Sequence, residues 1–332
     1  MEAVAIIGMG CRFPSAPSPR AFWQLICNGG DAITEVPADR YDIDAVYDPH
    51  PATPGKVMSR YGGFLEQVDQ FDAAFFGISP REAAKIDPQH RLLMEVAWEA
   101  MEDAGQVPHT MTEEEKLNIG CFIGVITGDY WDRQSHHAVA LDVYTTTGSA
   151  RSGAAGRISF SQDFMGTSFA IDAACSSSLV AVDQAVQNLR SGACTLALAG
   201  GVNIILTADH TIGFSQGKMM APDGHCKTYD AAADGYVRSE GAGIVVLKLL
   251  SQAQADGDQI YAIIRGCASN NDGHCNSFMA PSTKGQQAGL RKACRNAEID
   301  PLTIDYVEAH GPGTKAGDPV EITTLGEVLC AG

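Results

Sequence analysis

Cys175 is the residue in this chain best placed to act as a nucleophile. It lies in the run Asp172-Ala173-Ala174-Cys175-Ser176-Ser177-Ser178, after an apolar segment, and a helical pattern of apolar residues follows it and stops at Ser191-Gly192. A thiol at such a strand-to-helix turn lies near unpaired N–H groups and the positive end of the helix dipole, which lower a thiol pKa towards neutrality. The N–H of Cys175 could also donate to an oxyanion while an acyl thioester forms. These features favour an acyl-accepting nucleophile over a buried structural cysteine.

His310 is the candidate partner of this thiol. It lies in the loop Glu308-Ala309-His310-Gly311-Pro312-Gly313-Thr314, after an apolar segment and before a helical pattern. A neutral imidazole there can accept a proton or donate to a developing enolate oxygen, and the glycines allow a ligand to approach the backbone. The alternative is a loop histidine that only bonds to backbone.

Elements of two kinds must position these residues. Short apolar segments alternate with amphipathic ones, which predicts an α/β fold with buried sheets. Strands are expected at 3–7, 117–125, 168–172, 195–199, 244–249, 260–264 and 304–307. The first strand is expected to end at Gly8-Met9-Gly10, which does not continue into a dinucleotide-binding loop because Phe13 replaces its third glycine.

The helices carry recognisable end signals. One is expected to begin at Asp87-Pro88 and to stop at Gly105, and another covers 283–297. A third covers 318–329, with Asp318 as its N-cap and Glu321 closing a capping box. The stretch 28–61 is rich in Pro, Asp and Gly and reads as a long surface excursion. The strand, reactive loop and helix at 168–189 recur at 304–329, which suggests a duplicated unit.

Composition excludes several classes of function. The chain has 332 residues, 45% hydrophobic residues and a formal net charge of −17, which argues against nucleic-acid and anionic-membrane binding. The first residues do not resemble a signal peptide, and no apolar run approaches the length of a membrane span. The ten cysteines lack paired spacing, which indicates reduced thiols in the cytoplasm. His225-Cys226 and His274-Cys275 lack the partners of a metal site, so no metal is expected.

Together these segments resemble the ketosynthase (beta-ketoacyl synthase) domain of modular type I polyketide synthases, in the thiolase-like superfamily. The motifs that carry the resemblance span the whole chain. They are Ala5-Ile6-Ile7-Gly8-Met9-Gly10-Cys11-Arg12-Phe13-Pro14, Phe75-Phe76-Gly77-Ile78-Ser79-Pro80-Arg81-Glu82-Ala83, Asp87-Pro88-Gln89-His90-Arg91, Ala174-Cys175-Ser176-Ser177-Ser178-Leu179, Ala199-Gly200-Gly201-Val202-Asn203, Lys227-Thr228-Tyr229-Asp230, Ala233-Asp234-Gly235-Tyr236 and the His310 loop.

The resemblance implies a layered αβαβα fold built from two related halves and a homodimer. The chain would be one ketosynthase domain over 1–332, with a first half over about 1–255 and the start of a second half over about 256–332. The implied chemistry is decarboxylative Claisen condensation, with the acyl chain on Cys175 and with His310 stabilising the enolate or relaying protons. Gly311, Gly313 and Thr314 would meet the phosphopantetheine arm of an acyl carrier protein, which carries the substrates, so no directly bound cofactor is expected. Acyltransferase and linker regions of a polyketide synthase would be further partners.

Two departures from the family pattern bear on activity. Pro312 and Ala173 stand where the family commonly has threonine, and losing one hydroxyl contact would cost about 1 kcal/mol of binding. The family continues through a second catalytic histidine and a second oxyanion N–H, so the second half is expected to be incomplete. The alternative function is therefore a truncated ketosynthase-like module that dimerises or docks a carrier protein without turnover. A Cys-His hydrolase and a thiolase-type condensation are the weaker alternatives.

Overall fold

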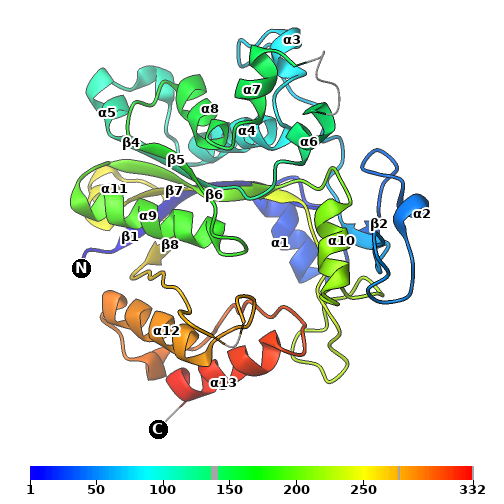
Figure 1. Ribbon diagram of the computed structural model, residues 1–332. Coiled ribbons are helices and arrows are strands. Elements are labelled where there is room, and N and C mark those ends of the chain that lie inside the picture. Colours follow the sequence, from blue (N-terminus) through cyan, green and yellow to red (C-terminus); the bar gives the residue numbers. More distant parts are fainter. Residues whose placement is uncertain (136–140, 276, 331–332) are drawn as a thin grey trace.

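The computed structural model describes residues 1–135, 141–275 and 277–330, and its centre is a six-stranded sheet with the order β5-β4-β6-β7-β1-β8 (Figure 1). Its strands are β1 (Val4–Arg12), β4 (Ile119–Gly124), β5 (Ser168–Ile171), β6 (Leu196–Asn203), β7 (Gly241–Leu249) and β8 (Ala262–Ile264). All lie at positions where the sequence predicts strands. β4 pairs in parallel with β5 and β6, while the β6–β7, β7–β1 and β1–β8 pairs are antiparallel.

Helices cover both faces of this sheet. On one face α4 (Pro88–Asp103) and α8 (Gly153–Gln162) pack on a core that contains Ile123 and Leu198. On the other face α9 (Ser177–Ser191) packs on a second core that contains Phe122. The two cores use alternate residues of β4, as expected for a strand buried on both sides. The result is a helix–sheet–helix sandwich (Figure 1).

The predicted start of α4 is confirmed, whereas the predicted end of β1 is wrong. Asp87 caps α4 by accepting from the N–H of Gln89 at 2.9 Å, and Pro88 is its first residue. β1, however, runs through Gly8 and Gly10 as far as Arg12. A Cβ on Gly8 would lie 2.5 Å from the Ala100 carbonyl oxygen, so these glycines let β1 lie directly against α4. The glycine pair serves close helix–strand packing and not a turn.

The remaining elements surround this sandwich. They are α1 (Pro19–Cys27), β2 (Ile33–Glu35), α2 (Ile43–Val46), β3 (Tyr61–Gly63), α3 (Pro80–Ala83), α5 (Glu113–Leu117), α6 (Asp129–Ser135), α7 (Val143–Ser149), α10 (Asp209–Gln216), α11 (Leu250–Asp256), α12 (Thr283–Ala297), α13 (Gly317–Leu329) and the short 3-10 helices Pro108–Thr110 and Pro301–Thr303. The stretch 28–61 is more ordered than a surface excursion, because β2 pairs with β3 and because Val36, Ile43 and Val57 are buried in a small core together with Phe64, Ile205 and Ala208.

The strand predicted at 304–307 is not formed. These residues are extended but pair with no strand among the described residues, and the Tyr306 side chain is 77% exposed. A strand requires a neighbour for its backbone hydrogen bonds, and α12 and α13 lie below the sheet without offering one (Figure 1). The proposed duplication is therefore present as loop and helix but lacks its strand. No helix of the described residues is long and apolar enough to cross a membrane.

Candidate active site

Cys175 lies in a cavity at the carboxyl ends of the parallel strands. It follows β5 and precedes α9, where the ends of β4, β5 and β6 meet. The cavity measures about 400 Å³. Its walls are Phe13, Gly124, Val125, Ile126, Ala174, Cys175, Ser178, Gly201, Val202, Asn203, Ser239, Glu240, Gly241, Ala242 and Gly243. The carboxyl edge of a parallel sheet is the usual place for a ligand site in α/β proteins.

The turn that carries Cys175 is sharp and held by hydroxyl groups. Ala174 adopts a left-handed backbone with φ of 51°, which is unusual for a residue with a side chain. The Ser177 hydroxyl accepts from the N–H of Ala173 at 2.9 Å and donates to the Ala174 carbonyl at 2.6 Å. The Ser176 hydroxyl donates to the Ala173 carbonyl at 2.7 Å. The three-serine run therefore fixes the backbone on both sides of the exposed Cys175.

Glycines let this turn approach the sheet. A Cβ on Gly124 would lie 2.7 Å from the backbone N of Ser178, and one on Gly201 would lie 3.0 Å from the Ser178 Cβ. Any larger residue would push the start of α9, and Cys175 with it, away from the strand ends. α9 itself runs from Ser177 to Ser191 and is capped by Gly192 with φ of 75°, so the helix predicted after Cys175 is confirmed.

Tyr236 is a neighbour of the thiol that composition and spacing did not single out. Burial raises the pKa of Tyr236 to about 12, and the charge that Cys175 carries as a thiolate adds to the shift. Phe214 of α10 packs edge-to-face with Tyr236, with ring centroids 5.8 Å apart, and the Arg238 guanidinium lies over the same Phe214 ring at 5.7 Å. Tyr236 therefore stays a neutral phenol beside Cys175 at ordinary pH.

The His310 loop is held by two carboxylates of α13. Glu321 accepts from the N–H groups of His310 and Gly311, both at 2.7 Å, and Asp318 accepts from the N–H of Gly313 at 2.9 Å. The predicted N-cap and capping-box roles of Asp318 and Glu321 are wrong, because α13 begins at Gly317 and both carboxylates point to the preceding loop. Asp318 lies in the first turn of α13 and Glu321 just after it, so the two carboxylates hold the loop over the helix start.

The same loop docks on the segment 226–236. The Thr228 hydroxyl donates to the Gly311 carbonyl at 2.7 Å, and the N–H of Gly235 donates to the Gly313 carbonyl at 2.9 Å. Gly311 and Gly313 have φ of 49° and 67°, and a Cβ on Gly311 would lie 2.4 Å from the Thr228 methyl carbon. Both positions therefore require glycine. Gly235 precedes Tyr236, so the segment that holds the His310 loop through its backbone also carries the tyrosine whose pKa responds to the charge of Cys175.

Within the described part of the chain, no hydrogen bond joins Cys175 to the His310 loop. The His310 side chain is exposed, and within the described residues its imidazole makes no hydrogen bond and does not bond to Cys175. The Thr314 hydroxyl accepts from the N–H of Gly317 at 3.0 Å. The roles assigned to Cys175, His310, Gly311, Gly313 and Thr314 stay predictions.

The two adjacent His-Cys pairs, at 225–226 and 274–275, bond to nearby polar groups. The parts of the chain that the structure describes hold no cluster of three or more His, Cys, Asp or Glu side chains that could bind a metal ion. His225 instead contacts Asp31 at 3.2 Å, and the Cys275 thiol donates to the Asp272 carbonyl at 3.7 Å.

The structure thus places an exposed cysteine between the carboxyl ends of parallel strands and the start of a helix, and a histidine in a loop held by glycines and carboxylates. Residues 1–253 match the family model for the beta-ketoacyl synthase N-terminal domain and residues 261–332 match that for its C-terminal domain. The chain belongs to the beta-ketoacyl synthase family.

Known proteins place it among polyketide ketosynthases. It is 47% identical over 325 residues to a phenolphthiocerol/phthiocerol polyketide synthase subunit of Mycobacterium tuberculosis, a match that covers 98% of this chain and 21% of that protein. It is 48% identical over 333 residues to another subunit of the same synthase, covering 99% of this chain and 15% of that protein. The chain therefore spans about a fifth or less of these relatives.

Solved structures agree with this placement. An oxazolomycin ketosynthase domain from Streptomyces albus JA3453 superposes with a TM-score of 0.91 at 38% identity, covering 98% of this chain and 55% of that one. The ketosynthase from module 6 of the bacillaene synthase of Bacillus subtilis 168 gives 0.89 at 37% identity, covering 99% and 55%. The predicted α/β, thiolase-like fold is confirmed by these likenesses.

Proposed function

We propose that this chain is a polyketide ketosynthase that forms carbon–carbon bonds by decarboxylative condensation, with Cys175 as the acyl acceptor. The observation that carries the proposal is the placement of Cys175, exposed in a cavity of about 400 Å³ at the carboxyl ends of three parallel strands. The family membership supports the same reaction. The hydroxyl-braced turn and the left-handed Ala174 hold the thiol in one place, which favours attack on a positioned carbonyl.

The reaction proceeds in two covalent stages. In the first, the Cys175 sulfur attacks the carbonyl carbon of an acyl thioester, and the phosphopantetheine thiol of the carrier protein leaves. In the second, a malonyl-type extender loses carbon dioxide, and the electron pair left on its α-carbon attacks the Cys175 thioester and releases the Cys175 thiolate. His310 donates to the enolate oxygen, and the Cys175 N–H donates to the oxyanion of the acyl carbonyl.

The glycine-rich loop that carries His310 would recognise the phosphopantetheine arm of the carrier protein. The backbone of Gly311 and Gly313 and the Thr314 hydroxyl would line the path of the phosphopantetheine arm, beside the His310 imidazole. An acyl carrier protein and the acyltransferase and linker regions of a polyketide synthase would be the partners, because the curated relatives are polyketide synthase subunits. All ten cysteines are free, which supports a reducing, cytoplasmic setting.

Site-specific labelling tests the nucleophile. The protein is incubated with limiting iodoacetamide, or with an acyl-carrier thioester, and the modified cysteine is found by mass spectrometry. Cys175 should react at least tenfold faster than Cys27, an exposed thiol at the C-terminal end of α1 that lies outside the cavity. Equal labelling of the two cysteines would contradict the proposal.

Carbon dioxide release tests the full reaction. With a malonyl carrier protein, the wild type should release carbon dioxide faster than the Cys175→Ala and His310→Ala variants. Release by the wild type no faster than by Cys175→Ala, with labelling of Cys175 intact, would favour the second candidate function. That candidate is an acyl-accepting module that docks carrier proteins or dimerises without completing condensation.

We further propose that the chain forms a homodimer through β5. The carbonyls of Thr167 and Ile171 accept hydrogen bonds from N–H groups of Cys121 and Val125. Because backbone groups alternate in direction along a strand, those of Ser168 and Ala170 point away from β4, at the open edge of the sheet. Three large apolar side chains, Phe160, Met165 and Phe169, are exposed beside this edge. A second copy of β5 would satisfy the backbone groups and cover these side chains together.

Sedimentation analysis tests this interface. Wild type and Ala170→Ser, which keeps the outward N–H, should sediment as dimers. Ala170→Pro removes that N–H without touching the β4 ladder and should be monomeric. A dimeric Ala170→Pro variant would exclude the β5 edge as the contact.

A further inference from the structure

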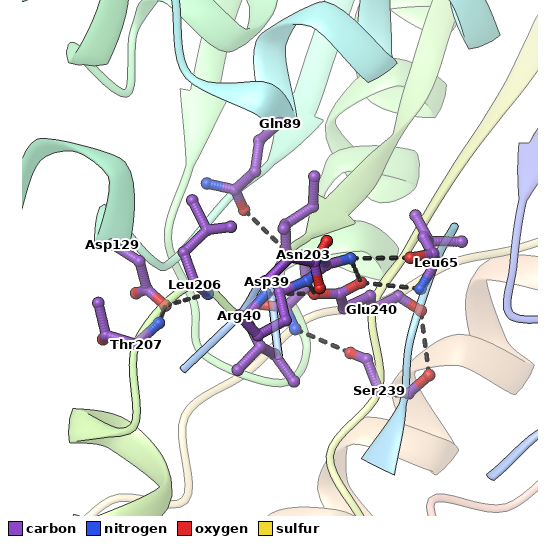
Figure 2. Close-up of polar contacts among 12 residues, drawn as sticks. Asp39, Arg40, Leu65, Gln89, Asp129, Asn203, Leu206, Thr207, Ser239 and Glu240 are labelled. Carbon is purple, nitrogen blue, oxygen red and sulfur yellow. Dashed lines mark hydrogen bonds and ion pairs between the residues drawn. The ribbon is translucent and has the colours of Figure 1, made fainter. Parts of the chain in front are cut away.

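A fully buried ion pair, Arg40 with Glu240, lies behind one wall of the Cys175 cavity. The Arg40 Nε and Nη2 donate to Glu240 Oε1 and Oε2 at 2.8 and 2.9 Å, a bidentate pair (Figure 2). The two side chains are 1% and 0% exposed. Removing both charges from water is costly, so such a pair is retained for what it holds in place more than for its net attraction.

The Glu240 carboxylate joins chain segments that are far apart in the sequence. It accepts from the backbone N–H of Leu65 at 2.8 Å and from that of Ile205 at 2.9 Å, in addition to Arg40. Arg40 in turn donates to the Leu65 carbonyl at 2.8 Å and to Asp39 at 2.7 Å. Four segments, around residues 40, 65, 205 and 240, therefore meet at one carboxylate (Figure 2).

Two of those segments are walls of the cavity. Glu240 itself and residues 239 and 241–243 line it, and so do Val202 and Asn203, which pair with Ala242 and Gly241 across the neighbouring strands β6 and β7 and come just before Ile205. The Asn203 side-chain amide donates to the Ser239 carbonyl at 2.8 Å and ties these walls together (Figure 2). The turn that carries Cys175 is braced separately, by Ser176 and Ser177, and has no bond to the ion pair.

We propose that Arg40 and Glu240 are positioning residues that set the shape of the acyl-chain cavity without contributing to the reactivity of the Cys175 thiol. The inference rests on the proposed acyl transfer to Cys175. The inference separates two properties of the site. The reactivity of the thiol depends on the turn before α9, whereas the length of acyl chain that fits depends on the cavity wall that the ion pair holds. The substrate class affected is therefore acyl thioesters long enough to reach that wall.

The test compares acylation with alkylation in three variants. Glu240→Gln keeps the shape but replaces one acceptor oxygen by a donor, so that the Leu65 or Ile205 N–H loses its partner. Arg40→Lys keeps the charge but loses the bidentate geometry. Asp39→Asn is the matched control, because Asp39 also bonds to Arg40 but is mostly exposed and lies outside the cavity. The probes are iodoacetamide and the acetyl and hexanoyl thioesters of N-acetylcysteamine.

For each protein we divide the rate of acylation by the hexanoyl donor by the rate of alkylation by iodoacetamide. In Glu240→Gln and Arg40→Lys this ratio should fall at least tenfold, because the KM for the hexanoyl donor rises. The same ratio for the acetyl donor should change less than threefold, and Asp39→Asn should match the wild type. Equal ratios in wild type and folded variants would overturn the inference. So would unfolding of both variants at 20 °C, since the pair would then serve the whole fold. A wild type that accepts no acyl group would instead contradict the proposed function.

Discussion

At the scale of single residues, the His310 loop and the wall of the Cys175 cavity are held by side chains that lie far away in the sequence, such as Thr228 for the loop and Arg40 for the wall. Cys175 and His310 are conspicuous because their types and local patterns are unusual, and both signals are contained in short runs. Tyr236, Arg40 and Glu240 act across large sequence separations, such as the 200 residues between Arg40 and Glu240. Local patterns carry no information on such contacts, so only the folded chain reveals them.

Glu321 provides a test of how the His310 loop is held. In Glu321→Gln one of the two backbone N–H groups, of His310 or Gly311, would face an amide NH₂ in place of an oxygen, which costs about 1–3 kcal/mol locally. Hydrogen exchange at these two amides should therefore accelerate about tenfold or more, while iodoacetamide labelling of Cys175 stays within twofold of the wild type.

The matched control for this variant is Glu308→Gln. Glu308 is the nearest exposed glutamate, and its carboxylate accepts from the Tyr306 hydroxyl and not from the backbone of the loop. No change in exchange is expected there. Equal exchange rates in Glu321→Gln and the wild type would show that the loop is held without the carboxylate.

Two buried groups of α4 should give stability opposite dependences on pH. Burial lowers the pKa of His90 to about 3, and nearby Arg157 adds to the shift. The unfolded chain therefore gains a proton below about pH 6.5 that the folded chain does not, and stability is lost as pH falls. Burial raises the pKa of Asp87 to about 6, although bonds from Gln89 oppose the shift. The folded chain then holds a proton that the unfolded chain releases, so stability is gained as pH falls from 6 to about 4.

Urea unfolding between pH 6 and pH 4 measures the two contributions. Relative to the wild type, His90→Leu should gain about 1.4 kcal/mol in free energy of unfolding for each pH unit lowered. Asp87→Asn, which can still cap the helix, should lose a similar amount per unit. Parallel pH profiles for a variant and the wild type would mean that the replaced group is not shifted.

At the scale of elements, the predicted end signals locate α4 and α12, whereas those at Asp318 and Glu321 do not mark the start of α13. The cap and proline at Asp87-Pro88 located α4, and 283–297 matched α12. These signals are local, since a helix satisfies its own backbone. A strand needs hydrogen bonds from a neighbouring strand. The apolar residues of 304–307 predict a strand, but no neighbouring strand pairs with them among the described residues. The predicted β1 ends too early because a glycine pair is also typical of a turn. Only the close contact of Gly8 and Gly10 with α4 shows why the strand has glycine there.

The β1–α4 contact gives an element-scale prediction. Gly8→Ala would place a methyl group 2.5 Å from the Ala100 carbonyl oxygen, where neither backbone can move freely. We expect a loss of about 1–3 kcal/mol in the free energy of unfolding, as for overpacked cores. Gly156→Ala in α8, whose added methyl group would meet no atom within 4 Å, should be neutral or stabilising. Equal stabilities of the two variants in thermal unfolding would show that β1 can move away from α4.

At the scale of the whole molecule, the sheet joins strands that lie far apart in the sequence as well as strands that lie close together. β4, β5 and β6 lie within residues 119–203 and pair in parallel, while Val4 at the start of β1 pairs with Leu249 at the end of β7. The α/β class of the fold can be predicted from the alternation of apolar and amphipathic segments. The order of the strands cannot, because no local feature of β1 selects a partner more than two hundred residues away.

That pairing sets the order in which the protein can assemble. During synthesis the first strand must wait for β7 and β8 to emerge before its hydrogen bonds can form, and such distant contacts slow folding. In refolding from urea with pulsed alkylation, Cys121 of β4 should become protected before Cys11 of β1, although both are buried in the native state. Protection of Cys11 first would contradict this order. Phe13, just after β1, and Gly241, at the start of β7, both line the cavity around Cys175, so the cavity closes only with that last pairing. A nascent chain therefore presents the Cys175 thiol for some time before the cavity around it exists.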